Sequence, residues 1–164
     1  MDSPRVLVIG AGVSGLSCAL LLKRRGYEVN IWAAETHPNT TSNRAAAVWY
    51  PFIVNPPELA TRWARETLAF IRQEFIGDSK SGVFPIVVTE LFEHAKEDPW
   101  WVEAVDQVRR LTDGKLPNGY SDGYEIDAAV MFTHMYLERL TEKVRDAGVP
   151  ITLRQTKPCG RSKP

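Results

Sequence analysis

The chain has 164 residues, of which 44% are hydrophobic, and its 20 Lys and Arg residues balance its 20 Asp and Glu residues. A chain of this size and composition can bury a substantial core, but its zero formal net charge provides no general attraction to nucleic acid. No apolar stretch approaches the roughly 20 residues of a membrane-spanning helix. We therefore expect neither nucleic acid nor a membrane as a partner.

The chain opens with the pattern of a strand, a helix and a second strand. Residues 5–9 form an apolar run that ends at Gly10, which indicates a strand buried on both faces of a parallel sheet. Residues 14–25 carry apolar side chains at helical spacing and end in three basic residues followed by a glycine, which predicts a helix. Residues 28–32 alternate and are rich in strand formers. This order predicts an α/β fold that begins with a right-handed strand–helix–strand unit.

The rest of the chain alternates between loops, helices and strands. Residues 34–57 contain four prolines and little periodicity, which predicts a long loop ordered by a ligand or by the rest of the fold. An amphipathic pattern over residues 58–75 predicts a helix. Residues 156–164 lack periodicity and apolar content, so we expect a disordered tail. The other expected elements are a strand at 83–92, a short helix at 99–111, a short extended segment at 124–126, a helix at 133–147 and a strand at 149–154 that returns to the sheet.

Cysteine and histidine are too sparse for a disulfide framework or a metal site. Cys18 and Cys159 lie far apart in the sequence, and so do His37, His94 and His134. None of them has a partner at the short spacing of metal ligands. We expect structural or surface roles for the histidines and no bound metal.

Both ends of the chain bear on the expected location. The apolar run at residues 6–9 stops at a glycine turn and is too short for the core of a secretory signal. Residues 162–164 read Ser-Lys-Pro and differ at the last position from the peroxisomal tripeptide Ser-Lys-Leu, so we do not expect them to act as that signal. We expect an intracellular, cytoplasmic protein.

A glycine motif between the first strand and the first helix carries the chemistry. Gly10, Gly12 and Gly15 have the spacing G-x-G-x-x-G of a dinucleotide-binding turn. The first glycine makes the tight turn, the second lets the backbone approach a pyrophosphate, and the third lets the helix pack closely on the strand. The pyrophosphate would lie at the helix N-terminus, where free N–H groups and the helix dipole favour an anion. The alternative is a glycine-rich turn with no ligand.

A carboxylate about 20 residues beyond the motif is expected to hold the ribose hydroxyls. Glu35 has this spacing and directly follows the second predicted strand, whereas Glu28 opens that strand and would lie at the wrong edge of the sheet. No arginine follows Glu35 to receive a 2′-phosphate, which disfavours NADP. The glycine motif by itself does not distinguish FAD from NAD.

The stretch from Thr40 to Phe52 resembles the second flavin-contacting segment of the D-amino acid oxidase family. It contains a hydroxyl run, an alanine run and then the aromatic sequence Trp-Tyr-Pro-Phe. Hydroxyls can donate to phosphate oxygens, and small residues let backbone N–H groups reach the edge of a flavin. A loop without a cofactor is the alternative for this stretch.

The resemblance covers the chain up to about Gln155 and implies the fold, the cofactor and its site. It implies a Rossmann-like FAD-binding parallel sheet with part of a mixed α+β substrate domain. Residues 1–155 would form the FAD-binding domain, with about 76–127 as a partial substrate-domain insertion and 156–164 as the tail. Carried over by position, the FAD contacts would be Gly10, Ala11, Gly12, Val13, Ser14 and Gly15 at the diphosphate, Ala34 and Glu35 at the ribose, Thr40, Thr41 and Ser42 at the phosphates, and Ala46, Ala47 and Val48 at the flavin.

Two positions depart from the pattern of the family. Ala34 stands where some relatives have an acid, and Glu35 would take over its role. Arg44 stands in a loop that is commonly apolar in the family, so its guanidinium would have to be exposed or paired.

The resemblance implies oxidative deamination of a D-amino acid to a 2-oxo acid, ammonia and H₂O₂. The resemblance implies that three features lie in a second half that this sequence lacks: the substrate-binding tyrosines, the arginine that pairs with the substrate carboxylate, and a further flavin contact. The chain does contain Arg44, Arg62 and Arg65, but none of them occupies the position of that arginine. We therefore expect a truncated N-terminal portion, and we assign no catalytic residue. The alternatives are a non-catalytic FAD-binding or partner-binding form, which could be a homo-oligomer, and an NAD-dependent dehydrogenase.

Overall fold

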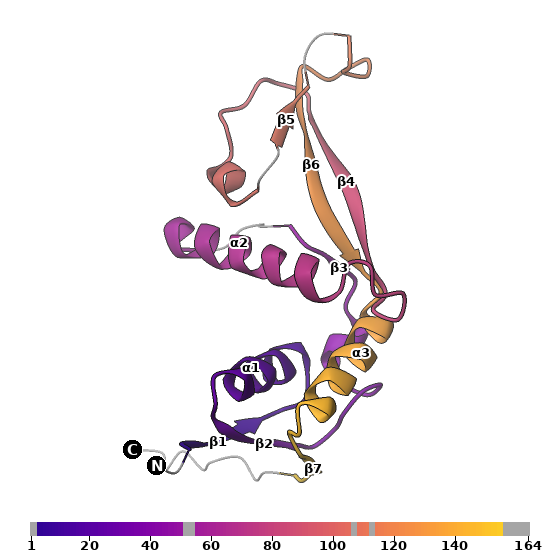
Figure 1. The fold of residues 1–164 in the computed structure, drawn as a ribbon. Coiled ribbons are helices and arrows are strands. Elements are labelled where there is room, and N and C mark those ends of the chain that lie inside the picture. The colour runs from indigo at the N-terminus through magenta and orange to yellow at the C-terminus, as the bar shows by residue number, and fades with distance from the viewer. Residues whose placement is uncertain (1–2, 51–54, 106–107, 112–113, 156–164) are drawn as a thin grey trace, which may run out of the picture. The chain divides into compact units, whose positions relative to one another are not determined.

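The computed structural model describes residues 3–50, 55–105, 108–111 and 114–155 (Figure 1). The chain is of the α/β class and divides into two compact units. The first consists of residues 1–46 and 133–164, and the second of residues 47–132. No helix of the described residues is long and apolar enough to cross a membrane.

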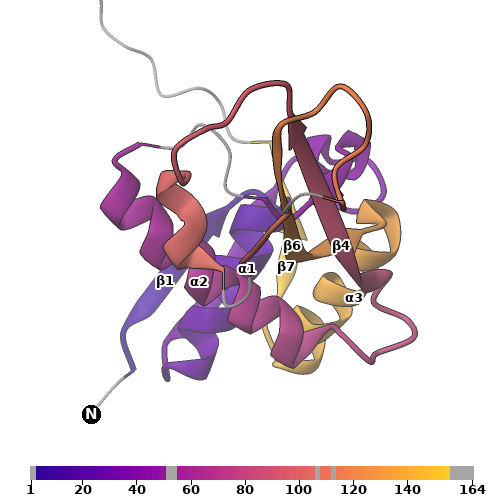
Figure 2. The same ribbon diagram turned by 90° about the horizontal axis from the view of Figure 1, so that it is seen from above.

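The first unit is built on a parallel sheet of three strands. Its strands are β1 (Arg5–Ile9), β2 (Glu28–Ala33) and β7 (Ile151–Leu153), in the order β1-β2-β7. The helices α1 (Val13–Arg24) and α3 (Thr133–Asp146) lie side by side over one face of this sheet (Figure 1, Figure 2). The predicted strand–helix–strand opening and the returning last strand are therefore confirmed.

The core of the first unit lies between this sheet face and the two helices. The side chains that fill it are fully or almost fully buried, and they are Leu16 and Leu20 of α1, Ile31 of β2, and Leu137, Leu140 and Val144 of α3. The opposite face of the sheet carries Leu7 and Ile9, whose side chains are 45% and 59% exposed. On the same face the Arg154 guanidinium lies over the Trp32 ring, 4.3 Å from its centroid, whereas Leu7 and Ile9 stay exposed. The prediction that residues 5–9 are buried on both faces is therefore wrong, although strands of a parallel sheet ordinarily are.

The first turn of α1 presses directly on the turn that precedes it. A Cβ atom at Gly15 would lie 2.0 Å from the carbonyl oxygen of Gly10 and 3.5 Å from the Val8 side chain. Only a residue without a side chain allows this approach of helix to strand. The third glycine of the motif therefore has the packing role that the spacing predicts.

The second unit is built on an antiparallel sheet. Its strands are β3 (Ala47–Val48), β6 (Asp122–Met131) and β4 (Val83–Phe92) in the order β3-β6-β4, and β5 (Val108–Arg110) also pairs with β6. The long β4–β6 pair runs in continuous register from Val83 opposite Met131 to Phe92 opposite Asp122 (Figure 1). The helix α2 (Pro57–Glu74) and the 3₁₀ helix η2 (Trp100–Ala104) belong to the same unit.

Aromatic side chains dominate the core of the second unit. Phe75 at the end of α2 is fully buried, and Tyr124 and Ile126 of β6 are almost completely buried. Trp101 of η2 contacts Tyr124 with a ring-centroid distance of 6.4 Å. The buried hydroxyl of Ser81 donates to the carbonyl oxygen of Phe75 at 2.7 Å, which joins the end of α2 to the start of β4.

Three predictions of secondary structure need correction. The helix predicted at 99–111 is wrong, because η2 ends at Ala104 and residues 108–110 form β5. The extended segment predicted at 124–126 is too short, because β6 continues to Met131 with partners on both sides. The predicted loop at 34–57 contains the 3₁₀ helix η1 (Thr41–Arg44) and β3. The assignment of about 76–127 to a substrate domain stays a prediction, and the expected tail lies outside the described residues.

Long-range ion pairs explain why β5 is a strand. Arg109 contacts Glu125 and Asp127 of β6 at 3.2 and 2.9 Å. Arg110 contacts Asp122 at 2.7 Å, and the buried Asp122 carboxylate also accepts the backbone N–H of Lys96 at 2.9 Å. These bonds form only when β5 lies beside β6, so the local helical pattern does not decide the structure.

We expect acid to weaken the attachment of β5 to β6. Hydrogen bonds from Arg110 and from the Lys96 backbone lower the pKa of Asp122 from 3.8 to about 2. Because this pKa is lower in the folded than in the unfolded chain, Asp122 stabilises the fold above its unfolded pKa and ceases to do so as the pH falls through about 2. Asp122→Asn should lower the free energy of unfolding at neutral pH and reduce its loss between about pH 4 and about pH 2. Urea unfolding followed by tryptophan fluorescence measures both, with the exposed Glu93→Gln as the control. Equal acid dependence of wild type and Asp122→Asn would contradict this account.

Gly15→Ala should destabilise the first unit by about 3 kcal/mol or more, because the new methyl group meets a backbone carbonyl that cannot rotate away. Gly12→Ala is the matched control, because its Cβ would meet only the side-chain oxygen of Ser42, at 2.9 Å. That variant should lose about 1 kcal/mol or less. Thermal unfolding by circular dichroism compares the two. Equal melting temperatures would show that the Gly10–Gly15 contact does not constrain the fold.

Candidate functional site

The glycine turn leaves the start of α1 open. Gly10 has a φ of +103°, and its N–H donates to the carbonyl oxygen of Trp32 at 2.7 Å, which ties the turn to the end of β2. Gly12 is the N-cap residue of α1 and has no side chain with which to cap the helix. The N–H groups of the first helical turn therefore depend on partners from elsewhere.

Ser42 provides one such partner from a distant part of the sequence. The Val13 N–H donates to Ser42 Oγ at 3.2 Å, across 29 residues of sequence. A Cβ atom at Gly12 would lie 2.9 Å from the same oxygen, so the approach of Ser42 depends on a glycine at this position. The glycine motif and the hydroxyl run, which are separate in the sequence, thus meet at the N-terminus of α1.

A shallow pocket of about 300 Å³ lies where these segments meet. Its lining consists of the glycine turn, the end of β2 and the hydroxyl run, namely Gly10, Ala11, Gly12, Ala33, Ala34, Glu35, Thr40, Thr41 and Ser42. All of these residues except Ala33 were predicted to contact the cofactor. Ala33 is the last residue of β2, so the predicted end of that strand could have indicated that Ala33 lines the pocket.

The lining is suited to a diphosphate. It offers the backbone N–H groups of a helix N-terminus and three hydroxyls, and small residues bring the backbone close to the pocket. Among the residues that the structure describes, the lining has no lysine or arginine, and its carboxylate belongs to Glu35. Within this lining a bound anion would be held by dipoles and neutral donors.

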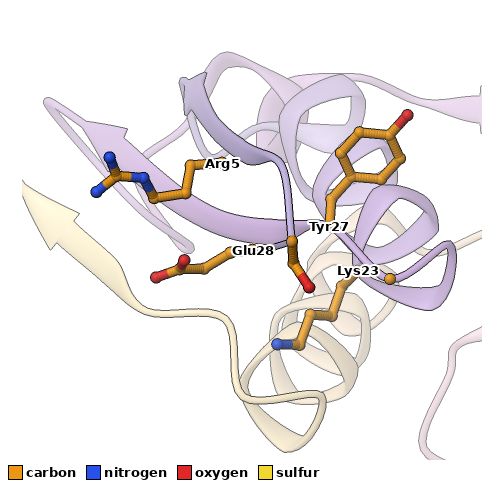
Figure 3. Close-up of a pocket in the computed structure, with 6 residues that line it drawn as sticks. Arg5, Lys23, Tyr27 and Glu28 are labelled. Atoms are coloured by element: carbon orange, nitrogen blue, oxygen red, sulfur yellow. The ribbon is translucent and has the colours of Figure 1, made fainter. Parts of the chain in front are cut away.

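Glu35 and Glu28 lie at opposite edges of the parallel sheet, as predicted. Glu35 follows the end of β2 and lines the pocket at the glycine turn, whereas Glu28 begins β2 in register with Arg5. Glu28 lines a second pocket, of about 780 Å³, together with Ser3, Arg5, Lys23, Gly26 and Tyr27 (Figure 3). The labelled side chains of this second pocket spread apart and do not converge on one point (Figure 3). We assign it no function.

The other predicted site residues divide between the two units. Val13, Ser14 and Gly15 form the first turn of α1, and Ala46 is the last residue of the first unit's N-terminal segment. Ala47 and Val48 form β3, which belongs to the second unit. The predicted diphosphate contacts are thus all in the first unit, whereas the predicted flavin contacts are divided between the first unit (Ala46) and the second (Ala47 and Val48).

A contact between two histidines was not anticipated from the sequence. The rings of His37 and His134 lie 4.5 Å apart between centroids, and His37 Nδ1 lies 2.9 Å from Asn43 Nδ2. Within the described part of the chain no group of three or more His, Cys, Asp or Glu residues could hold a metal ion. The two histidines are far apart in sequence, so spacing could not reveal their contact.

Comparison with known proteins identifies the family. The sequence model of the FAD dependent oxidoreductase family matches residues 5–156. The chain is 43% identical over 147 residues to the D-amino-acid oxidase of Dictyostelium discoideum, an overlap of 87% of this chain and 42% of that protein. It is 39% identical over 152 residues to the D-amino-acid oxidase of Rubrobacter xylanophilus, an overlap of 92% of this chain and 46% of that protein. The chain thus spans less than half the length of these relatives.

Solved structures of oxidases share the fold. L-α-glycerophosphate oxidase from Mycoplasma pneumoniae with FAD bound superposes with a TM-score of 0.70 at 13% identity, over 93% of this chain and 45% of that one. Glycine oxidase from Geobacillus kaustophilus superposes with a TM-score of 0.60 at 20% identity, over 92% of this chain and 47% of that one. At these identities the similarity concerns the fold alone.

The family match decides between the cofactors that the glycine motif leaves open. It sets aside the nicotinamide alternative, because the matching family is defined by FAD. It agrees with the resemblance of the stretch that begins at Thr40. The chain belongs to the FAD-dependent oxidoreductase family that includes the D-amino-acid oxidases.

Proposed function

We propose that the first unit binds the ADP half of FAD, and that the chain is the cofactor-binding part of an oxidase of D-amino acids. The observation that carries the first part is the contact between Ser42 and the start of α1. It joins two segments that each have the chemistry of phosphate recognition, and the absence of a side chain at Gly12 permits it.

The diphosphate would lie at the N-terminus of α1. Ser42 Oγ accepts the Val13 N–H, so the proton of this hydroxyl remains to be donated to a phosphate oxygen. The exposed hydroxyl of Thr41 is a second donor in the same lining. The helix dipole adds a favourable field for the negative charge.

The two ends of FAD would meet different residues. Glu35 would accept hydrogen bonds from the ribose hydroxyls beside Ala34, and no arginine follows it that would select a 2′-phosphate. Ala46, Ala47 and Val48 would border the flavin ring, where small side chains leave backbone N–H groups accessible. Val48 is about half exposed, which supports its availability for such a contact.

The substrate class rests on the relatives. The two at 43% and 39% identity are named D-amino-acid oxidases. The chemistry that bound FAD would supply is uptake of a hydride from the α-carbon and reoxidation by O₂ to H₂O₂, after which the imine hydrolyses to a 2-oxo acid and ammonia. The residues of this chain would bind and orient the cofactor for that reaction.

A second candidate is FAD binding without catalysis by this chain. A substrate carboxylate needs a positioned cation, ordinarily a bidentate arginine. Arg109 and Arg110, on the antiparallel sheet, already pair with carboxylates of the chain. Arg62 on α2 pairs with Glu66. These arginines are therefore engaged in the structure itself.

Ser42→Ala should weaken FAD binding by about tenfold or more, because it removes a hydroxyl that we place at a charged phosphate. Gly12→Ala should weaken binding similarly, because its methyl group displaces Ser42 Oγ from the Val13 N–H. Since both changes act on one contact, the double variant should lose much less than the sum of the two losses. Titration calorimetry measures the dissociation constants, with the exposed Ser79→Ala as the matched control. Wild-type affinity in Ser42→Ala would remove Ser42 from the site.

A spectrum of the FAD-loaded chain under anaerobic conditions distinguishes the two candidates. We expect the visible flavin band to persist after addition of D-alanine or D-aspartate, because the arginines of the sheet are held by carboxylates. Dithionite should bleach the same band and serves as the control for a reducible flavin. Bleaching by a D-amino acid would show that the chain alone contains a complete oxidase site.

A further inference from the structure

Three side chains form a hydrogen-bonded chain that ends at the pocket wall. Thr40 Oγ1 donates to Asn43 Oδ1 at 2.8 Å, and Asn43 Nδ2 donates to His37 Nδ1 at 2.9 Å. Thr40 is buried and lines the pocket at the glycine turn. Because His37 Nδ1 accepts a hydrogen bond, the ring is neutral in this arrangement and carries its proton on Nε2.

This arrangement withholds the Thr40 proton from a ligand. A hydroxyl has a single proton, and that of Thr40 is directed to Asn43. The Ser42 hydroxyl differs, because its oxygen accepts the Val13 N–H and its proton is available to a ligand. Of two neighbouring hydroxyls in the same lining, one can donate to a phosphate and the other cannot.

Rotating the Asn43 side-chain amide so that its oxygen and nitrogen exchange places would free the hydroxyl proton of Thr40 for another acceptor. Asn43 Nδ2 would then donate to Thr40 Oγ1, and the Thr40 hydroxyl could donate a hydrogen bond to a phosphate oxygen. Oδ1 would then face His37 Nδ1, which must carry a proton to donate. A neutral ring with its proton on Nδ1 meets this requirement, and so does an imidazolium, because both of its ring nitrogens are donors. The charge around the ring decides between the two.

The groups around His37 bias it toward the neutral form in the free chain. Burial and the neighbouring His134 lower the pKa of His37, whereas Glu138 acts in the opposite direction. His134 and Glu138 are the charged or titratable groups that act on His37 from α3, and Asn43 is its neutral partner from η1. A diphosphate in the pocket that Thr40 lines would add its negative charge to the influence of Glu138 and favour the imidazolium. Among the described residues the lining has no lysine or arginine, so an imidazolium at the far end of this hydrogen-bonded chain would add a positive charge near a lining without one.

We propose that His37 and Asn43 are positioning residues of the diphosphate site. On this proposal, binding of the FAD diphosphate turns the Asn43 amide, frees the Thr40 proton for a phosphate oxygen, and is accompanied by uptake of one proton at His37. The inference rests on the proposed FAD site and adds to it a linkage between cofactor binding and pH.

Titration calorimetry of the full chain with FAD tests the linkage. The diphosphate of FAD keeps its charge between about pH 8 and about pH 5.5, so a pH dependence in this range reports on the protein. FAD should bind about three- to tenfold more tightly at the lower pH. Repeating the titration in buffers of different ionisation enthalpy should show proton uptake on binding. Circular dichroism at each pH confirms that the chain stays folded.

Two substitutions distinguish a positioning role of His37 and Asn43 from a purely structural role. His37→Gln should remove the pH dependence, so that its dissociation constant for FAD stays the same between about pH 8 and about pH 5.5, because a glutamine amide does not titrate in this range. Asn43→Asp should weaken binding at every pH, because a carboxylate accepts from both Thr40 and His37 and holds the Thr40 proton in place. His94→Gln, at an exposed histidine of the second unit, is the control and should behave as wild type.

The outcomes are distinct. Binding of FAD with the same dissociation constant across this range and with no proton uptake would overturn the inference and leave the proposed function standing. A pH dependence that survives in His37→Gln would place the proton elsewhere and would also overturn it. Failure of the wild-type chain to bind FAD at any pH would overturn the proposed function, and this inference with it.

Discussion

The open N-terminus of α1 is the constraint on which the first unit depends. A helix that leaves its first N–H groups for a ligand cannot use an ordinary capping side chain, and the N-cap residue here is Gly12. The turn from β1 must then be completed within a few residues, which places Gly10 at positive φ and brings Gly15 against the Gly10 carbonyl. Each glycine thus meets a different physical requirement, and Ser42, from a distant part of the sequence, accepts the N–H of Val13, the first residue of the helix.

Hydroxyl protons are important in the described part of the pocket lining, which has no lysine or arginine. A diphosphate carries a negative charge on each phosphate, whereas a helix N-terminus offers roughly half a positive charge. Within this lining, oriented donors would meet the difference. In such a site the direction of one hydroxyl proton matters, and that direction is set by the partners of Thr40 and Ser42 rather than by the two residues themselves.

Local patterns in the sequence were sufficient for the first unit and insufficient for parts of the second. The apolar run at 5–9, the glycine motif and the basic end of α1 are signals within a few residues of the structures they specify, and the strand, the turn and the helix that they predict are confirmed. The segment 99–111 has helical spacing, yet Arg109 and Arg110 reach carboxylates of β6 that lie far along the chain. Pairing across such distances overrides local propensity, and spacing cannot reveal it.

The same distinction applies to the pocket. Motif spacing predicted its lining because the turn, the end of β2 and the hydroxyl run each have a recognisable composition. The chain of hydrogen bonds from Thr40 to His37 could not be predicted, because it depends on how residues 37–43 fold back on themselves. The contact of His37 with His134 could not be predicted either, because the two residues lie in the N-terminal and C-terminal segments of the first unit.

Two different scaffolds hold the segment that resembles the flavin-contacting stretch of the family. Thr40, Thr41 and Ser42 are fixed within the first unit by η1 and by the bond to Val13. Ala47 and Val48 are fixed in the second unit by pairing with Met131 and Val130 of β6. Among the described residues, the lining of the pocket proposed for the diphosphate comes from the first unit. On the proposed function, recognition of the ADP half would therefore be contained within one unit, and binding of the cofactor and alignment of its reactive ring would be separable properties of this chain.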